Sequence, residues 1–589
     1  MAKQLPARLS YILVLLLFCA CTTDKKVIPA KNIVTVRLPT APDNLNPYTI
    51  NAYAQQVSLK LFSSLLSFDA NKLTMQPFLA KQLPEIELLP DGKTNYTYEI
   101  HEEARWDNGD PVLASDYVFT LKVLFNPYAQ TNAFVSYLDF VEDVKIDDKN
   151  PRKFTILSNK QYILIKVNTG SMPILPEYLF DPEHTMANFS LAEMVSFLNE
   201  KPTAAQATLL AQFGERFTGA DYTTNLDFLR GSGPYRLAEW QPAQKIVLEK
   251  KKGWWGDQLA AKYPMLTANP EKIIYRPIVD DASMLTELKS GALDVVSNVQ
   301  ANSFFDLKRN TNVQEQFNLY TPPSLLYYFI ALNGANPKLE DKRVRRALAH
   351  LVDVEEIIET VMQGLGERIH GPIHPKRPYF HDSLAFIPFS VAQAQALLKA
   401  AGWVDSNNDG IVDKVIDGER VDLSLTIKIG AGNDTGKSIA ILFKENARKA
   451  GVKIEIEAHE LSKLRTLVRQ RDYEMAYRAW SLPETLDDLK QVWHTKSQLI
   501  PDGNNYVNFG DVVSDELIEA IRTNVKETER NQLYQQIQEV IYDEQPYIFL
   551  FTPKGRLVIH KRFQAQTSIK FPGYHESFFS LAQEEFVGN

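Results

Sequence analysis

No cysteine follows Cys21 in this chain of 589 residues, and that absence limits how the fold can be held together. Both cysteines, Cys19 and Cys21, lie within the first 21 residues. The rest of the chain therefore has no disulfide, no thiolate metal site and no cysteine nucleophile. A chain of this length exceeds what one hydrophobic core supports, so we expect several cores, in roughly three or four domains or lobes, packed without cross-links.

The first twenty residues have the pattern of an export signal. Lys3 and Arg8 precede an uncharged apolar run at residues 11–20. A run of about ten residues is too short to cross a bilayer, which takes about 20 apolar residues, but it matches the hydrophobic region of a secretory signal peptide. No comparable run recurs downstream. We therefore predict an exported protein with a signal peptide at residues 1–20 and a tether at residues 21–31.

The end of this segment carries a candidate lipidation site. The string Leu17-Phe18-Cys19-Ala20-Cys21 resembles a lipobox, in which a small residue precedes a cysteine that is acylated and becomes the mature N-terminus. Ala20 fits the small-residue position, whereas Phe18 stands where leucine is usual. We predict lipidation at Cys21, which would anchor the protein in a membrane on the periplasmic side of the cell envelope. The alternative is an ordinary cleaved signal with two incidental cysteines.

Charge argues against nucleic acid as the main partner. The chain has 64 Lys and Arg against 72 Asp and Glu, a net charge of -8, whereas nucleic-acid binding calls for a basic surface. Hydrophobic residues make up 44% and charged residues 23%, as in ordinary folded proteins. We expect a folded protein that does not bind nucleic acid.

Strand-like and helix-like segments alternate along the chain. Branched apolar residues alternate at residues 33–38, as in a strand, and apolar residues follow at helical spacing over residues 53–66. Further strands are predicted at residues 96–100, 235–240, 246–250, 423–429 and 452–456, and further helices at 114–124, 204–213, 286–293, 391–401 and 438–450. Ser390 and Gln393 form a capping box at the start of one of these helices. The alternation indicates an α/β fold.

Short motifs distributed over nearly the whole chain resemble one known family. The clearest are Trp106-Asp107-Asn108-Gly109-Asp110-Pro111-Val112 and Gly231-Ser232-Gly233-Pro234-Tyr235. Others lie at residues 61–66, 77–80, 116–121, 254–256, 288–294, 341–348, 396–403 and 545–546. In content and order these motifs resemble extracellular solute-binding protein family 5, which includes the oligopeptide-, dipeptide- and nickel-binding receptors of ABC importers.

The resemblance implies a type II periplasmic-binding-protein fold, a two-lobed hinge clamp with an extra inserted domain. Lobe one would comprise residues 32–66, 230–309 and 546–589, the inserted small domain residues 67–229, and lobe two residues 310–545. Such a clamp closes over its solute, because a solute that contacts both lobes favours the shut state.

The resemblance also implies the function. We expect a monomeric substrate-binding lipoprotein that captures a peptide-like or other small solute and delivers it to the permease of an ABC importer. One alternative is a nutrient-capturing or sensory surface lipoprotein without a permease. A periplasmic hydrolase is the alternative of another class, but the chain has neither Gly-x-Ser-x-Gly nor His-Glu-x-x-His.

Position within the family pattern gives candidate solute-binding residues. They are Asn51, Tyr53, Tyr327, Tyr328, Asn333, Trp480, Phe551 and Thr552. Aromatic and amide groups suit a solute that is stacked and hydrogen-bonded. The alternative for these residues is core packing, which for each tyrosine is considered as an equal possibility.

The residues after Trp480 bear on the nature of the solute. Peptide-binding relatives share a Trp-x-Ala-Asp string whose aspartate pairs with the ammonium group of the peptide. Pro483 stands where that aspartate belongs, so this contact does not carry over. Glu484, one place further on, is the candidate substitute.

Two segments have partial metal-site patterns. Asp405, Asn407, Asp409 and Asp413 occupy positions 1, 3, 5 and 9 of a calcium loop, but position 12 is Ile416 instead of glutamate. We expect a turn before a strand here, with structural calcium as the alternative, and no other cofactor. His370, His374 and His381 cluster among prolines that prevent a regular helix, so we expect a mobile or hinge-side loop there.

Overall fold

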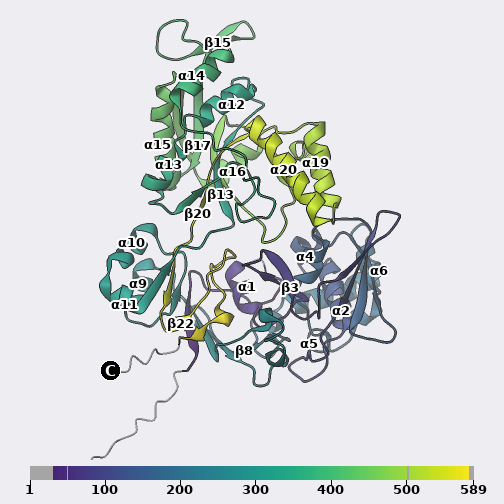
Figure 1. The fold of residues 1–589 in the computed structure, drawn as a ribbon. Helices are drawn as coiled ribbons and strands as arrows, with labels where there is room; N and C mark the ends of the chain where they lie inside the picture. The colour runs from purple at the N-terminus through teal and green to yellow at the C-terminus, as the bar shows by residue number, and fades with distance from the viewer. Residues whose placement is uncertain (1–30, 50, 501–502, 583–589) are drawn as a thin grey trace, which may run out of the picture. The chain divides into compact units, whose positions relative to one another are not determined.

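The computed structural model describes residues 31–49, 51–500 and 503–582. The predicted signal peptide, Cys21 and most of the predicted tether lie outside the described residues. Residues 32–589 form a unit separate from residues 1–31. Figure 1 shows the fold, which is mixed α/β with several sheets, as predicted.

Lobe one is built on a seven-stranded sheet. Its strands, in spatial order, are β12 (Phe317–Tyr320), β21 (Leu557–His560), β11 (Val295–Val296), β1 (Ile33–Leu38), β10 (Lys272–Pro277), β9 (Lys245–Lys250) and β8 (Tyr235–Gln241). Strand β1 runs parallel to both of its neighbours, and the outer strands are antiparallel. One face is covered by α9 (Asp281–Lys289), α10 (Ala301–Arg309) and α11 (Thr311–Gln316), seen together in Figure 1.

Lobe two is built on a six-stranded sheet. Its strands, in spatial order, are β14 (Gly366–Arg368), β20 (Tyr547–Pro553), β13 (Leu326–Leu332), β19 (Met475–Ser481), β17 (Ser424–Gly430) and β18 (Lys453–His459). Helices α12 (Lys342–Ala349), α14 (Val391–Ala400) and α15 (Asp434–Arg448) share one core with this sheet. A second core holds α16 (Leu461–Arg469), α17 (Lys490–Trp493), α19 (Val512–Thr523) and α20 (Glu527–Glu544). The sheet is therefore buried on both faces, as its apolar strands require.

The inserted domain has a four-stranded antiparallel sheet of its own. The strands are β4 (Glu85–Leu88), β5 (Thr94–Glu99), β7 (Lys153–Ser158) and β6 (Val141–Ile146). The hairpin β2 (Leu66–Asp69) and β3 (Thr74–Pro77) precede it. The main helices are α2 (Ala114–Phe125), α3 (Asn132–Val135), α4 (Ile165–Gly170), α5 (Glu177–Phe180), α6 (Leu191–Ser196), α7 (Ala204–Thr218) and α8 (Ala220–Thr223). These elements and β1 belong to one continuous hydrophobic core, so the insertion is fused to lobe one.

The strand pairing moves two of the predicted lobe boundaries. Strand β12 pairs with β21 in the seven-stranded sheet, although residues 310–545 are predicted for lobe two. Strand β20 pairs with β13 and β14 in the six-stranded sheet, although residues 546–589 are predicted for lobe one. A strand belongs to the sheet that satisfies its backbone hydrogen bonds, and motif order does not reveal that partner. The chain thus crosses between the sheets after Tyr320 and after Pro553.

The first predicted helix is the clearest local error. The structure has α1 only at Ala52–Ser58, and residues 59–66 leave the helix. There the backbone forms hydrogen bonds with residues far away along the chain. The Gly233 amide donates to the Leu61 carbonyl at 2.9 Å, and the Tyr235 amide donates to the Lys60 carbonyl at 3.2 Å. Gly233 has no room for a Cβ, which would lie 2.4 Å from the Lys60 carbonyl oxygen. Long-range pairing overrides the helical spacing of the apolar residues.

Most other predicted elements are confirmed within a few residues. Half of the predicted capping box is present: the Ser390 hydroxyl accepts from the Gln393 amide at 3.2 Å ahead of α14, whereas the Ser390 amide donates to the His350 carbonyl at 2.9 Å instead of to the Gln393 side chain. Predicted helices at 204–213 and 286–293 correspond to α7 and α9, with shifted ends. No helix among the described residues is long and apolar enough to cross a membrane.

Candidate functional site

A cavity of about 310 Å³ lies between α1 and helices α2 to α4 of the inserted domain. It is lined by Pro47, Tyr48, Gln55, Leu59, Leu124, Phe134, Tyr137, Leu138, Asn168, Ser171, Met172 and Pro173. This volume is at the small end of the usual range for ligand pockets. Sequence reasoning missed this cavity, because its walls come from three separate stretches of chain.

Three polar side chains in the cavity wall, those of Tyr48, Gln55 and Asn168, are already hydrogen-bonded to the backbone. The Gln55 amide donates to the Thr49 carbonyl at 2.7 Å, and the Asn168 amide donates to the Tyr137 carbonyl at 2.7 Å. The Tyr48 hydroxyl donates to the Pro173 carbonyl. What remains facing the cavity is chiefly carbon, which suits an apolar group of a solute.

Two predicted residues, Asn51 and Tyr53, lie at the N-terminal end of α1. The Asn51 side chain accepts from the Tyr53 and Ala54 amides at 3.0 and 3.2 Å, so it is the N-cap of the helix. The Tyr53 ring meets the edge of Phe571, with centroids 5.4 Å apart. The structure gives Asn51 a structural role, and its contact with solute stays a prediction.

Glu484 contacts the C-terminal loop through an ion pair. Its Oε2 lies 2.9 Å from Nζ of Lys570, the residue before Phe571. Both side chains are about one-third or more exposed, so the pair is accessible to solvent. The carboxylate predicted as a substitute ammonium anchor therefore already has a cationic partner. No spacing in the sequence links positions 484 and 570.

On the lobe-two side, Trp480 projects from β19 onto an aromatic surface. Its ring stacks on Phe329 and Tyr506, at centroid distances of 6.4 and 6.1 Å. Its indole nitrogen donates to the Tyr547 hydroxyl at 3.3 Å. The tryptophan is half-buried, which leaves part of its surface open to a solute.

Arg478 lies two residues before Trp480 on the same face of β19 and was not predicted. Its guanidinium has no carboxylate partner among the described residues, and its buried Nε has no hydrogen bond there. The side chain is partly exposed. Burial raises the pKa of neighbouring Tyr506, and the positive charge of Arg478 opposes that rise. A half-buried, uncompensated guanidinium is suited to an anionic group.

Four predicted residues are packed inside lobe two. Tyr327, Asn333, Phe551 and Thr552 are at most 5% exposed. The Asn333 amide donates to the Arg471 and Tyr473 carbonyls at 3.2 and 2.8 Å, which fixes a turn. Tyr328 is half-buried and stacks on Tyr477 at 5.7 Å. Core packing, the alternative considered for the candidates, describes the four buried residues.

A buried ion pair supports the loop that follows Trp480. Arg377 donates to the Glu484 carbonyl at 2.9 Å and to the Pro483 carbonyl, and its Nε lies 3.5 Å from the Asp487 carboxylate. The Tyr379 hydroxyl donates to the same carboxylate at 2.7 Å. Burial raises the pKa of Asp487, while Arg377 and Tyr379 lower it.

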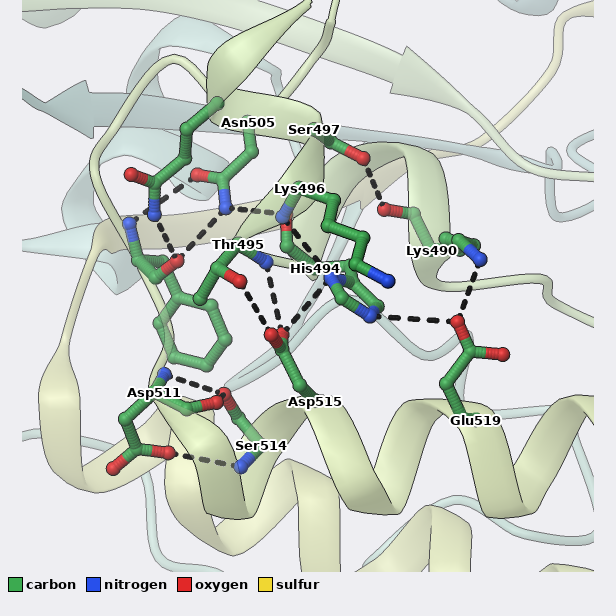
Figure 2. A network of polar contacts seen from close by, with 12 residues as sticks. Lys490, His494, Thr495, Lys496, Ser497, Asn505, Asp511, Ser514, Asp515 and Glu519 are labelled. Atoms are coloured by element: carbon green, nitrogen blue, oxygen red, sulfur yellow. Dashed lines mark hydrogen bonds and ion pairs between the residues drawn. The ribbon is translucent and has the colours of Figure 1, made fainter.

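A polar network fixes the next part of this region to α19 (Figure 2). His494 is buried, with Nδ1 3.2 Å from the Asp515 carboxylate and Nε2 3.4 Å from the Glu519 carboxylate. Lys490 pairs with Glu519 at 2.6 Å. The Asn505 amide donates to the His494 carbonyl at 3.1 Å. The network ties α17 and the chain after it to α19.

The candidate calcium ligands are engaged within their own loop. The Asp405 carboxylate accepts from the Asp409 and Gly410 amides at 3.2 and 3.0 Å. The Asp413 carboxylate accepts from the Ser406 amide and hydroxyl at 2.9 and 2.7 Å. The Asn407 amide donates to Asp409 at 2.8 Å. These contacts are those of a self-bonded turn, as expected, and calcium binding here stays an untested alternative.

Of the two expectations for the histidine cluster, burial argues against a mobile loop, and a hinge-side loop stays a prediction. His370 and His374 are 6% and 1% exposed, and burial lowers the pKa of each to about 4. His381 lies nearer the surface, 3.0 Å from the Glu539 carboxylate. Across the described part of the chain, no group of three or more His, Cys, Asp or Glu is placed to hold a metal ion.

Comparison with known proteins places these observations in one family. The family model described as "Bacterial extracellular solute-binding proteins, family 5 Middle" matches residues 74–498. Over 521 residues, covering 87% of this chain and 84% of the relative, the chain is 26% identical to the oligopeptide-binding protein AppA of Bacillus subtilis. It is 21% identical over 514 residues, 87% of each chain, to the dipeptide-binding protein of Escherichia coli.

Solved structures show the same fold. HbpA2 from Haemophilus parasuis matches with a TM-score of 0.73 and 20% identity, over 94% of this chain and all of that one. NikA from Brucella suis, solved with Fe(III)-EDTA, matches with a TM-score of 0.70 and 18% identity, over 93% of this chain and all of that one. The predicted two-lobed architecture is confirmed.

Proposed function

Since the chain belongs to the bacterial extracellular solute-binding proteins of family 5, we propose that it is the substrate-binding component of an ABC importer, with a peptide-like solute. Relatives named for oligopeptides and dipeptides support the solute class. The observation that carries the proposal in this chain is Arg478, a guanidinium without a carboxylate partner among the described residues. Every unmodified peptide supplies one terminal carboxylate for it.

The two ends of such a solute would be recognised differently. Glu484 is paired with Lys570, so a solute ammonium group would have to displace an internal cation. Arg478 has no comparable competitor among the described residues. The apolar cavity beside α1 would receive an apolar side chain. We therefore propose recognition through a carboxylate and an apolar group rather than through the ammonium group.

Titration calorimetry with a tripeptide, its N-acetyl form and its C-terminal amide tests this recognition. We expect N-acetylation to change the affinity little and amidation to weaken it by about tenfold or more, the usual effect of losing a hydrogen bond to a charged group. Arg478→Gln should weaken binding of the acid and abolish the difference between acid and amide. The matched control is Arg465→Gln on the exposed face of α16. Equal affinity of the wild-type protein for acid and amide would contradict the proposal.

We further propose that the mature protein is a lipoprotein anchored through Cys21, with the permease of the importer as its partner. The short apolar run and the lipobox-like string support the anchor. Cys21→Ser should abolish fatty-acid labelling in the producing cells, whereas Cys19→Ser should leave it. If fatty-acid labelling persists in Cys21→Ser, Cys21 is not the lipidation site, and the first twenty residues are better explained as an ordinary cleaved signal peptide.

Family membership favours binding over catalysis. We propose that the protein is not an enzyme, that it acts as a monomer and that it has no resident cofactor. A nutrient-capturing or sensory lipoprotein would use the same solute site. Stimulation of solute-dependent ATP hydrolysis by a reconstituted permease would distinguish the import role.

A further inference from the structure

Two residues at the start of α4, Ile163 and Ile165, are buried in the cores of different lobes. Ile163 is 5% exposed and belongs to the core that the six-stranded sheet shares with α16, α17, α19 and α20. Ile165 is fully buried in the core shared by lobe one and the inserted domain. The chain between them does not cross from one sheet to the other, unlike the segments after Tyr320 and Pro553. A non-covalent contact therefore connects the lobes in addition to the two chain crossings.

Polar contacts reinforce the insertion of Ile163. Its amide donates to the Arg522 carbonyl at the end of α19, at 2.9 Å. The Tyr162 hydroxyl donates to Asp488 Oδ2 at 2.7 Å, and Arg522 Nε lies 3.0 Å from both oxygens of the same carboxylate. The Arg522 guanidinium also lies 5.1 Å from the centre of the Tyr162 ring. Burial and the nearby Asp488 raise the pKa of Tyr162, so its hydroxyl stays protonated and donates.

The receiving surface on lobe two is braced by its own contacts. Glu519 accepts from Arg522 at 2.9 Å and pairs with Lys490 at 2.6 Å. The buried His494 approaches both Glu519 and Asp515, as Figure 2 shows. These contacts hold α19 in place from several sides. We therefore expect the hydrogen bonds and the apolar contact of Tyr162 and Ile163 with lobe two to form or break together.

We propose that Tyr162 and Ile163 form a latch that holds the inserted domain against lobe two and favours the closed arrangement of the clamp. Two chain crossings alone permit the lobes to rotate about the line that joins them. The latch opposes that rotation, because opening would expose Ile163 and break the hydrogen bonds of its amide and of the Tyr162 hydroxyl. These are positioning residues for the proposed solute site, on which this inference rests: they act by holding together the lobes that carry it.

The latch is separable from the stability of either lobe. Both hydrophobic cores contain many buried residues besides Ile163. A substitution of Ile163 therefore removes a contact between the inserted domain and lobe two and leaves most of each core intact. A purely structural residue would instead lower the melting temperature and leave the spacing of the lobes unchanged. Solution scattering measures that spacing directly.

Ile163→Ser and Tyr162→Phe test the latch. In the solute-free protein we expect Ile163→Ser to increase the radius of gyration measured by small-angle X-ray scattering, and Tyr162→Phe to do so less. If the closed fraction falls to about one-tenth, the apparent affinity for the tripeptide falls about tenfold, through faster dissociation. The matched control is Ile146→Ser, at a 40% exposed isoleucine in β6 of the same domain, which should change neither quantity.

A folded Ile163→Ser protein with an unchanged radius of gyration would overturn the latch. So would a loss of melting temperature without any change in lobe spacing. If Ile163→Ser does not fold, Tyr162→Phe and Asp488→Asn decide in the same way. The scattering measurement needs no solute, so a protein that opens on mutation but binds no peptide would support the latch while contradicting the proposed solute.

Discussion

Replacing Arg377 with methionine is expected to destabilise lobe two by about 3–5 kcal/mol, the usual cost of breaking a buried ion pair from one side. The side chains of Arg377 and Asp487 are 1% and 4% exposed. Methionine fills most of the volume but leaves the Asp487 carboxylate without a cation. It also removes the donors to the Pro483 and Glu484 carbonyls, so the loop after Trp480 loses its support.

The loss should depend on pH. Burial raises the pKa of Asp487, and Arg377 opposes that rise, so the pKa climbs further without the arginine. An acid whose folded pKa exceeds its unfolded value, about 3.9, loses stability as pH rises through the interval between the two. The deficit of Arg377→Met should therefore be smallest near pH 4 and largest at neutral pH.

Urea unfolding at both pH values measures this effect. The control is Arg343→Met, because Arg343 is an exposed arginine paired with Asp341 at the start of α12 and should have little effect at either pH. A deficit of the same size at pH 4 and pH 7 would mean that the Asp487 charge is not its cause.

Local sequence patterns predicted most helices and strands correctly. The predictions were wrong where contacts between residues far apart in the chain determine the structure. Strand β1 and helix α14 carry their information within a few residues: alternating side chains in one, a serine N-cap in the other. The end of α1 depends on Gly233 and Tyr235, more than 170 positions away along the chain. Strands β12 and β20 have the composition of strands, but the sheet that each joins depends on its partners.

The same distinction applies to the candidate site. Trp480 could be predicted because it stands in a recognisable string, and it is half-buried among aromatic rings. Lys570 could not be, because its role arises from an ion pair with Glu484 across 86 positions. Arg478 is a charged residue within a strand, which is a weak signal by itself. Its significance comes from the absence of a carboxylate partner among the described residues, which depends on how the chain folds and not on its local sequence.

Replacing Glu576 with glutamine should give the opposite pH response. Glu576 is 1% exposed and accepts from the Tyr275 hydroxyl and, at 3.3 Å, from the Gln56 amide of α1. Its other oxygen lies 3.7 Å from Nζ of the buried Lys60. Glutamine keeps an acceptor for Tyr275 but leaves Lys60 without a counter-charge beside Lys570. We expect a loss of about 3–5 kcal/mol at neutral pH.

The direction of this pH dependence is set by the pKa of Lys60. Burial lowers the pKa of Lys60, Glu576 raises it and Lys570 lowers it, so removing the carboxylate depresses the pKa further. A base whose folded pKa lies below its unfolded value, about 10.4, gains stability as pH rises between the two values, because the unfolded chain binds more protons there. The Glu576→Gln deficit should therefore shrink as pH is raised from 7 towards 10, whereas that of Arg377→Met should not.

A double variant tests whether the ion pair, and not the side-chain volume, is responsible. Lys60→Met combined with Glu576→Gln removes both charges, and removing both partners of a buried pair costs far less than removing one. We expect the double variant to recover most of the stability lost in Glu576→Gln and to lose its pH dependence. The control is Glu239→Gln, from a surface pair with Lys245 in which both side chains are 39% exposed. A double variant no more stable than Glu576→Gln would show that hydrogen bonds to Glu576, and not its charge, anchor the C-terminal loop to α1.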